Sequence, residues 1–299
     1  MAPSRQAPAS KREGGKAAAR VAASRVSRSS RDAKEAPVGA GDPLVVQALA
    51  RGLKVMEAFA SADAPLSLSE IAARVGLDRS AAQRMVHTLR SAGWLIAGEN
   101  GRGVRPGPAF LLHTYDSLRL DPLLRRASPV LIELRRAVRE RVDLSLMDGA
   151  RMIYALRMQS KRENFFATLV GHSVPTAQTS GGWAALAALP PRDVEAILDA
   201  SSLSAITPFT LTSRVAIRKE IARARANGHA LASQQIQIGE IALGVALRDA
   251  TGRPVGAIHV AGSLSEWSPQ AFRDRVAPLA AEAVRAIEMS ASHARGRAM

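Results

Sequence analysis

The stretch LDRSAAQRMVHTLRSAGWL, residues 77–95, decides how the first part of the chain folds. Its apolar residues recur at the i, i+3, i+4, i+7 spacing that marks one face of an α-helix. They are Ala82, Met85, Val86 and Leu89. This spacing predicts an amphipathic helix over residues 79–91, with the apolar stripe turned toward a core.

The opposite face of this predicted helix is polar. Polar residues repeat with the same spacing as the apolar stripe but are shifted from it by two residues, and two residues turn an α-helix by about 200°. No carboxylate occurs between Arg79 and Gly98, whereas an ordinary surface helix mixes acidic and basic side chains. Arginine, glutamine, histidine and serine donate to phosphates and base edges in a DNA major groove. We therefore predict DNA contacts from this helix and from a serine of the helix before it. The predicted residues are Ser69, Arg79, Ser80, Gln83, Arg84 and His87.

A second helix is predicted just before the first. Ser67 and Glu70 have the spacing of a capping box, which would start a helix over residues 67–75. Gly76 then breaks this helix, and Asp78 can cap the next one through its side-chain oxygen. Two helices joined by a short glycine-containing turn form a helix-turn-helix. A plain helical hairpin inside a core is the alternative, and the missing acids favour DNA binding over it.

A small β-hairpin is predicted after the two helices. Residues 93–97 have the character of a strand, Asn100-Gly101 is a strong turn signal, and residues 102–105 return as a second strand. A hairpin in this place is the wing of a winged helix. We predict that Arg102 and Arg105 lie against phosphates or reach a minor groove.

Composition bounds the class of protein. The chain has 299 residues, a formal net charge of +15 and 47% apolar residues, which favours two folded domains and a polyanionic partner, nucleic acid before membrane. There is no cysteine, so disulfides, zinc fingers and thiol nucleophiles are excluded. No apolar run is long enough to span a membrane. We expect a cytoplasmic protein with no membrane contact, no metal site and no cofactor.

The chain begins with a basic segment. Residues 1–42 are rich in Ala, Ser, Arg, Gly and Pro and hold too few large apolar residues to bury a core, so we expect a disordered tail. An inert extension is the simplest interpretation. A loose phosphate-binding arm and an organelle transit peptide are the alternatives.

Periodicity divides the rest of the chain. Residues 43–108 form the predicted winged helix-turn-helix domain, and residues 109–120 form a linker helix. Residues 121–293 form an effector-binding domain, and residues 294–299 are expected to be a disordered C-terminus. The fold class is therefore α+β.

The sequence also predicts the bounds of several helices and strands within these segments. The first helix is expected over residues 43–60, with Leu49 on its apolar stripe, and the domain after the linker opens with a helix over residues 121–142. The sheet of that domain should be antiparallel, with strand candidates at residues 164–170 and 236–238. A final helix is expected from residue 268 to about residue 290.

Several segments, taken in order, resemble the IclR-type transcriptional regulators. Residues 46–56 and 75–80 resemble the winged-helix domain of that family, and residues 142–154 and 207–212 resemble its second domain. The resemblance covers roughly residues 44–290. It implies a GAF-like effector-binding domain, a homodimer or homotetramer, and control of catabolic genes by a small metabolite. A two-fold dimer implies a palindromic operator in double-stranded DNA.

Within that family, residues 179–182 and 233–239 are most similar to the regulators of protocatechuate and related β-ketoadipate-pathway genes, which implies an aromatic carboxylic acid as effector. By this resemblance Trp183 would stack on the aromatic ring, and a protonated His259 would pair with the carboxylate. Trp183, His259 and Ala261 depart from the family's usual residues. A core tryptophan and a satisfied strand histidine are the alternatives. The implied pocket residues are Thr179, Ser180, Gly181, Gly182, Trp183, Ala242, His259 and Ala261.

Two other classes of function compete with a ligand-responsive DNA-binding regulator. An enzyme is not predicted, because the Gly-x-Ser-x-Gly, His-Glu-x-x-His and P-loop motifs are missing and the histidines are scattered. A non-specific nucleic-acid-binding or architectural protein would use the tail and the net charge alone. Such a protein would show no base preference.

Overall fold

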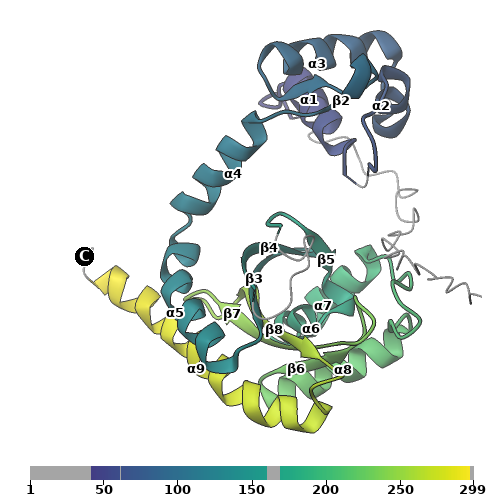
Figure 1. Ribbon diagram of the computed structural model, residues 1–299. Coiled ribbons are helices and arrows are strands. Elements are labelled where there is room, and N and C mark those ends of the chain that lie inside the picture. The colour runs from purple at the N-terminus through teal and green to yellow at the C-terminus, as the bar shows by residue number, and fades with distance from the viewer. Residues whose placement is uncertain (1–41, 61, 160–168, 297–299) are drawn as a thin grey trace, which may run out of the picture.

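The computed structural model describes residues 42–60, 62–159 and 169–296 (Figure 1). The expected tail lies outside these residues except for Asp42, and so does most of the strand candidate at residues 164–170. The described chain forms a small N-terminal unit, a connecting helix and a larger α/β unit. Among the described residues, no helix is long and apolar enough to cross a membrane.

The N-terminal unit consists of three helices and one hairpin. The helices are α1 (Gln47–Glu57), α2 (Leu68–Val75) and α3 (Arg79–Ser91), and the strands are β1 (Leu95–Ala97) and β2 (Val104–Pro106). Leu66 and Val104 exchange two backbone hydrogen bonds of 2.9 and 2.8 Å, which fasten the hairpin to the chain just before α2. We call these elements the winged unit.

The predicted caps of α2 and α3 are present. The backbone N–H of Glu70 donates to the Ser67 hydroxyl at 3.3 Å, and the backbone N–H of Ser67 donates to the Glu70 carboxylate at 2.8 Å. Gly76 ends α2 in the left-handed conformation that glycine adopts without strain. Asp78 then accepts from the backbone N–H of Ala81 at 2.8 Å and begins α3. The turn between the two helices is therefore fixed by short-range hydrogen bonds.

The core of the winged unit collects one apolar face from each element. Ile71 of α2, Val86 of α3 and Leu95 of β1 are buried there. The prediction for α1 was partly wrong, because this helix buries Val55 while Leu49 stays 63% exposed. The apolar residues of α1 cover more than one face, so periodicity alone did not show which face meets α3.

The wing differs in detail from the prediction. Ala97 pairs with Val104, so residues 98–103 form the loop, wider than a two-residue turn. Asn100 and Gly101 do adopt positive φ angles of 57° and 70°, as their sequence indicates.

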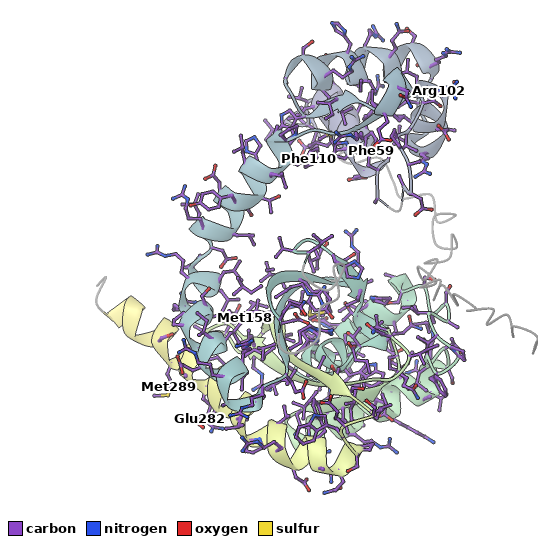
Figure 2. The ribbon with its side chains drawn as sticks, viewed as in Figure 1. Phe59, Arg102, Phe110, Met158, Glu282 and Met289 are labelled. Carbon is purple, nitrogen blue, oxygen red and sulfur yellow. The ribbon has the colours of Figure 1, made fainter. Side chains whose placement is uncertain are left out.

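Two helices connect the winged unit to the sheet of the larger unit. Helix α4 (Ala109–Leu120) leaves the wing, and Asp121 caps α5 (Pro122–Val138) through hydrogen bonds of 2.7 and 3.2 Å to the first turn. Figure 2 shows Phe110 at the point where α4 leaves the winged unit. The helix predicted to reach residue 142 ends at Val138, because Arg139 takes a left-handed conformation and the chain turns into a strand.

The larger unit contains a six-stranded antiparallel sheet with the strand order β5-β4-β3-β8-β7-β6. The prediction of an α+β fold with an antiparallel sheet is confirmed. Strand β3 lies at the centre of the sheet between β4 and β8. The strands are β3 (Arg141–Asp148), β4 (Arg151–Met158), β5 (Ser173–Pro175), β6 (Ala230–Ser233), β7 (Glu240–Arg248) and β8 (Pro254–Ser263).

Helices cover both faces of this sheet (Figure 1). Helices α5 and α9 (Pro269–Gly296) pack on one face over a core that includes Leu144, Val260 and Phe272. The other face is covered by α6 (Ser180–Ala187), α7 (Pro191–Ala200) and α8 (Arg214–Asn227), over a second core. Because β3 contributes Val142 and Leu144 to the first core, its alternate residues face α6.

Two further expectations differ from the structure. Residues 236–238 are not a strand but part of the turn between β6 and β7, where Gln234 takes a positive φ of 56°. The final helix α9 continues to Gly296, beyond its expected end.

Substitution of Ser67 tests the capping box. Ser67→Ala removes the acceptor for the first turn of α2, so we expect a loss of about 1 kcal/mol in unfolding free energy. Ser69→Ala, two residues on in the exposed first turn, is the matched control and should leave stability nearly unchanged. Denaturant unfolding followed by circular dichroism measures both, and equal losses would contradict the role given to the cap.

Candidate DNA-binding face and effector pocket

Helix α3 turns its polar residues outward. Its buried residues are Ala81, Ala82 and Val86, which hold the helix against α1 and α2. All of the polar residues predicted on its opposite face are exposed: Arg79, Ser80, Gln83, Arg84 and His87. The predicted stripes are therefore present, and α3 offers one continuous donor-rich face without a carboxylate.

Four arginines on α3 and the wing are available to meet an external anion. Within the described part of the chain, no ion pair engages Arg79, Arg84 or Arg102, and Arg105 contacts only the carbonyl of Pro106. Figure 2 shows Arg102 on the outer side of the winged unit. Surface arginines of the larger unit behave differently, since Arg218 pairs with Glu195 at 2.6 Å. Unpaired arginines on a helix and its wing are the groups that neutralise DNA phosphates.

A small pocket lies in the larger unit between the sheet and the N-terminus of α6. Its volume is about 20 Å³, little more than a water molecule requires. Strands β3, β4, β7 and β8, α6 and the β6–β7 turn all contribute to it. The lining residues are Arg141, Tyr154, Thr179, Ser180, Ala232, Gln234, Gln235, Ile236, Glu240, Ala242, His259 and Ala261.

The structure brings together only some of the predicted pocket residues. Five of them line the pocket: Thr179, Ser180, Ala242, His259 and Ala261. Gly181 and Gly182 lie behind it as points of close packing, since a Cβ on Gly181 would sit 2.0 Å from His259 Cε1 and one on Gly182 would sit 1.9 Å from the Thr176 carbonyl oxygen. Gly181 thus lets α6 approach the sheet at β8, and Gly182 lets it approach the short helical turn at Thr176–Gln178.

Trp183 has a structural environment of its own. Its side chain is 2% exposed and belongs to the core beneath α6, α7 and α8. Its Nε1–H donates to the Ala177 carbonyl at 2.7 Å. The indole therefore has its polar atom satisfied within the core, and the structure places it outside the pocket lining.

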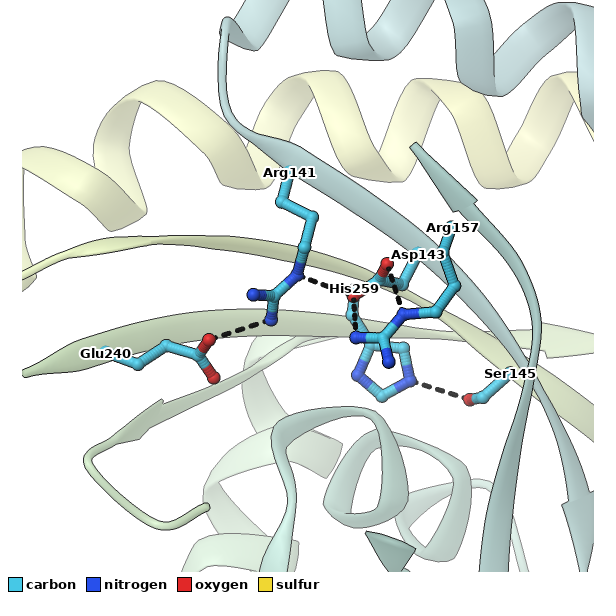
Figure 3. Close-up of polar contacts among 6 residues, drawn as sticks. All are labelled: Arg141, Asp143, Ser145, Arg157, Glu240 and His259. Atoms are coloured by element: carbon cyan, nitrogen blue, oxygen red, sulfur yellow. Dashed lines mark hydrogen bonds and ion pairs between the residues drawn. The ribbon is translucent and has the colours of Figure 1, made fainter. Parts of the chain in front are cut away.

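A buried network of charged groups reaches the pocket through Arg141 and Glu240, which line it (Figure 3). Asp143 lies at its centre, accepting from Arg141 Nε at 2.9 Å and from Arg157 Nε at 3.1 Å. Arg141 then donates through Nη2 to Glu240 at 2.7 Å. Burial alone would disfavour the charged guanidinium, but Glu240 and Asp143 raise the pKa of Arg141 above its usual range. Two arginines and two carboxylates balance in charge.

His259 lies beside this network and is neutral. Its ring shares a hydrogen bond of 2.6 Å with the Ser145 hydroxyl, and burial lowers its pKa to about 4, against a smaller opposing effect of Asp143. The positive charges of Arg141 and Arg157 contribute to this lowering of the His259 pKa. Without a ligand the ring therefore carries no charge near neutral pH, which favours the satisfied strand histidine over a protonated partner for a carboxylate.

Tyr154 and Ser180 complete the polar wall. Burial, and then the nearby carboxylates, raise the pKa of Tyr154, so its phenol stays protonated, and the Arg157 guanidinium lies 3.9 Å from its ring centre. Ser180 is 1% exposed, and its hydroxyl has no hydrogen-bond partner among the described residues. Such a group in a pocket wall is available to a bound molecule.

Sequence analysis missed the charged residues of this wall. Arg141, Asp143 and Ser145 alternate along β3 and so share one face of the strand. That pattern was visible in the sequence, but a polar face usually meets solvent. Only the pairing of β3 with Arg157 on β4 and His259 on β8 shows that this face is covered.

Comparison with known proteins identifies the family. Residues 116–289 match the family model described as bacterial transcriptional regulator IclR C-terminal, and residues 48–96 match the IclR helix-turn-helix domain. The chain belongs to the IclR family. The predictions of this family, of a ligand-responsive DNA-binding regulator and of a protein that is not an enzyme are confirmed.

Individual relatives agree with the family match. The Pca regulon regulatory protein of Pseudomonas putida is 27% identical to this IclR-family chain over 248 residues, covering 83% of this chain and 84% of the relative. The regulator Rv1719 of Mycobacterium tuberculosis is 33% identical over 204 residues, which cover 68% of this chain and 77% of the relative. A crystal structure of an IclR homolog from Microbacterium hydrocarbonoxydans, complexed with 4-hydroxybenzoate, matches this chain with a TM-score of 0.65 and 25% identity. The match covers 82% of this chain and 99% of that one.

The chemistry of the described residues offers no metal centre, since no three histidine or carboxylate side chains gather in a way that could hold an ion there. The pocket instead offers guanidinium, hydroxyl, amide and imidazole groups. Those groups bind small organic molecules through hydrogen bonds and charge.

The pKa of His259 makes a prediction about stability and pH. Between pH 6.5 and 4 the unfolded chain takes up a proton that the folded His259 does not, so unfolding free energy falls by about 3 kcal/mol as pH drops through that window. His259→Gln should remove this part of the fall. Urea unfolding at several pH values measures it, with His87→Gln, an exposed histidine, as the control. Parallel curves for wild type and His259→Gln would overturn the prediction.

Proposed function

We propose that this IclR-family regulator reads a double-stranded operator with α3 and the wing, and that a small-molecule effector held in the pocket alters that binding. The exposed, acid-free face of α3 with unpaired Arg79 and Arg84 is the observation that carries the proposal. The assigned DNA contacts are Ser69, Arg79, Ser80, Gln83, Arg84, His87, Arg102 and Arg105. Because it acts on the genome, we place the protein in the cytoplasm.

We infer that the effector is an aromatic carboxylic acid and that the regulated genes are catabolic. One relative is named for the Pca regulon, and one similar structure contains 4-hydroxybenzoate. The pocket supports the assignment chemically, because Arg141 can meet a carboxylate and Tyr154 offers an aromatic wall. At about 20 Å³ the pocket must open to admit such a molecule, so binding and a change of conformation are coupled.

We infer that the working unit is a dimer on a palindromic operator, with a tetramer as a pair of such dimers. Helices α1 and α4 expose large apolar side chains, which usually mark a protein interface. Leu49 and Leu53 are 63% and 58% exposed on α1, and Leu111 and Leu112 are 73% and 68% exposed on α4. A second copy covering these residues would place two α3 helices for two half-sites.

A non-specific architectural role is the competing proposal. The net charge of +15 would hold the protein on any DNA. Base preference at constant salt separates the two roles, because charge alone binds all sequences equally.

Arg84→Ala tests sequence-specific binding. We expect it to weaken binding to the DNA upstream of this protein's own gene by about 1–3 kcal/mol, and binding to random DNA far less. Arg192→Ala removes the same charge from the distant helix α7 and serves as the control. Fluorescence anisotropy at two salt concentrations, with aromatic acids added in turn, measures all three proteins. If Arg84→Ala weakens binding to both DNAs equally, Arg84 contacts only phosphates and does not read bases.

Leu49→Glu tests the dimer. Placing a charge on the exposed apolar face of α1 should shift the protein toward monomer in sedimentation and weaken operator binding together. Val215→Glu puts the same charge on an exposed apolar site of α8, where it should change neither. If wild type and Leu49→Glu sediment alike, this face is not the interface.

A further inference from the structure

The pocket is nearly filled by the protein's own polar side chains. Arg141, Glu240 and His259 line a volume of about 20 Å³, while 4-hydroxybenzoate alone has ten heavy atoms. A ligand of that size therefore enters only if the lining moves, and breaking one of the internal contacts would make room. The contact that breaks most easily decides which chemical group of a ligand binds there.

The four internal contacts differ in how much they resist breaking. The Asp143–Arg157 pair has side chains 1% and 4% exposed and two hydrogen bonds, and Asp143 also holds Arg141. The Ser145–His259 bond is likewise buried. Separating a buried pair leaves an uncompensated charge or polar group, which is costly.

The contact between Arg141 and Glu240 is the exception. Both side chains are 17% exposed, and one hydrogen bond of 2.7 Å joins them. Glu240 is the first residue of β7, so its carboxylate can turn into water without moving the centre of the sheet. Arg141 meanwhile keeps its bond to Asp143.

We propose that Arg141 binds the carboxylate of the effector and that Glu240 occupies this place until the effector arrives. The proposal rests on the proposed effector pocket and names its specificity-determining residue. One carboxylate replaces another, so two arginines still balance Asp143 and one further negative charge. A guanidinium can also meet a carboxylate through two parallel hydrogen bonds, which favours this ligand group over a neutral one.

Other features of the pocket agree with an acid rather than a base. A cationic ligand would need a free carboxylate deep in the pocket, but both oxygens of Asp143 already accept from arginines. The unpartnered hydroxyl of Ser180 lines the same pocket and can donate to the polar atom of a bound acid. Its neighbour Thr179 is occupied, because it caps α6 through Gly182.

The variant Glu240→Gln of the full chain tests this exchange. It removes the competing charge while keeping the size of the side chain, so carboxylates should bind about tenfold more tightly than to wild type. The probes are benzoate, 4-hydroxybenzoate and salicylate, each compared with its primary amide by thermal shift. The amides should gain much less than the acids, because they carry no charge to pair with Arg141, so the ratio of acid to amide affinity should rise. Glu195→Gln, which breaks a surface pair with Arg218, is the control and should change nothing.

Arg141→Gln gives the opposite result, loss of the preference for acid over amide, provided circular dichroism shows that it folds. If Glu240→Gln leaves the ratio of acid to amide affinity unchanged, the exchange is wrong whatever Arg141→Gln does. The same holds if no acid stabilises either wild type or Glu240→Gln. Operator binding measured on the same samples separates the two proposals. If the wild-type protein shows no sequence-specific DNA binding, the proposed regulator is wrong. If it binds specifically but Glu240→Gln leaves the ratio of acid to amide affinity unchanged, only the role of Arg141 is wrong.

Discussion

The buried carboxylate of Asp143 is the constraint on which the proposed effector pocket depends. It lies on the central strand of the sheet and is fully buried, and a charge in that place is stable only when cations and hydrogen bonds compensate it. Arg141 and Arg157 provide that compensation from the same strand and from its neighbour. Their positive charges in turn help to keep His259 neutral, and Arg157 lies over the Tyr154 ring. One acid thus determines the charge and the shape of the whole wall.

The pocket and the proposed DNA-binding face lie in separate units, which are joined by the helices α4 and α5. Helix α4 leaves the winged unit through a packed aromatic group, in which His113 stacks on Trp94 at 4.5 Å and Phe110 meets the same indole edge-on at 5.1 Å. Helix α5 follows and packs on the sheet that carries the pocket. In the described chain α4 and α5 thus join the two units, and each helix packs against one of them.

The two sites use charge in opposite ways. In the winged unit Arg79, Arg84 and Arg102 are exposed and unpaired by the described carboxylates, so their charge is available to the proposed DNA partner and would respond to salt. The pocket pairs every arginine with an acid, so its net charge is small, and it discriminates by the geometry of a few contacts. Long-range attraction suits a partner found by diffusion along a polyanion. Short-range pairing suits the choice between similar small molecules.

The sequence by itself determined α2, α3 and the turn between them, because their signals are local. The capping box at Ser67, the left-handed Gly76, the Asp78 cap and the two stripes of α3 all act within one or two helical turns. The buried face of α1 and the network around Asp143 were decided only by tertiary structure. Arg141 and Glu240 are 99 positions apart, and the alternation along β3 does not tell which side of the sheet a helix covers. Burial, which makes His259 neutral and turns Asp143 into a structural charge, is a property of the assembled layers.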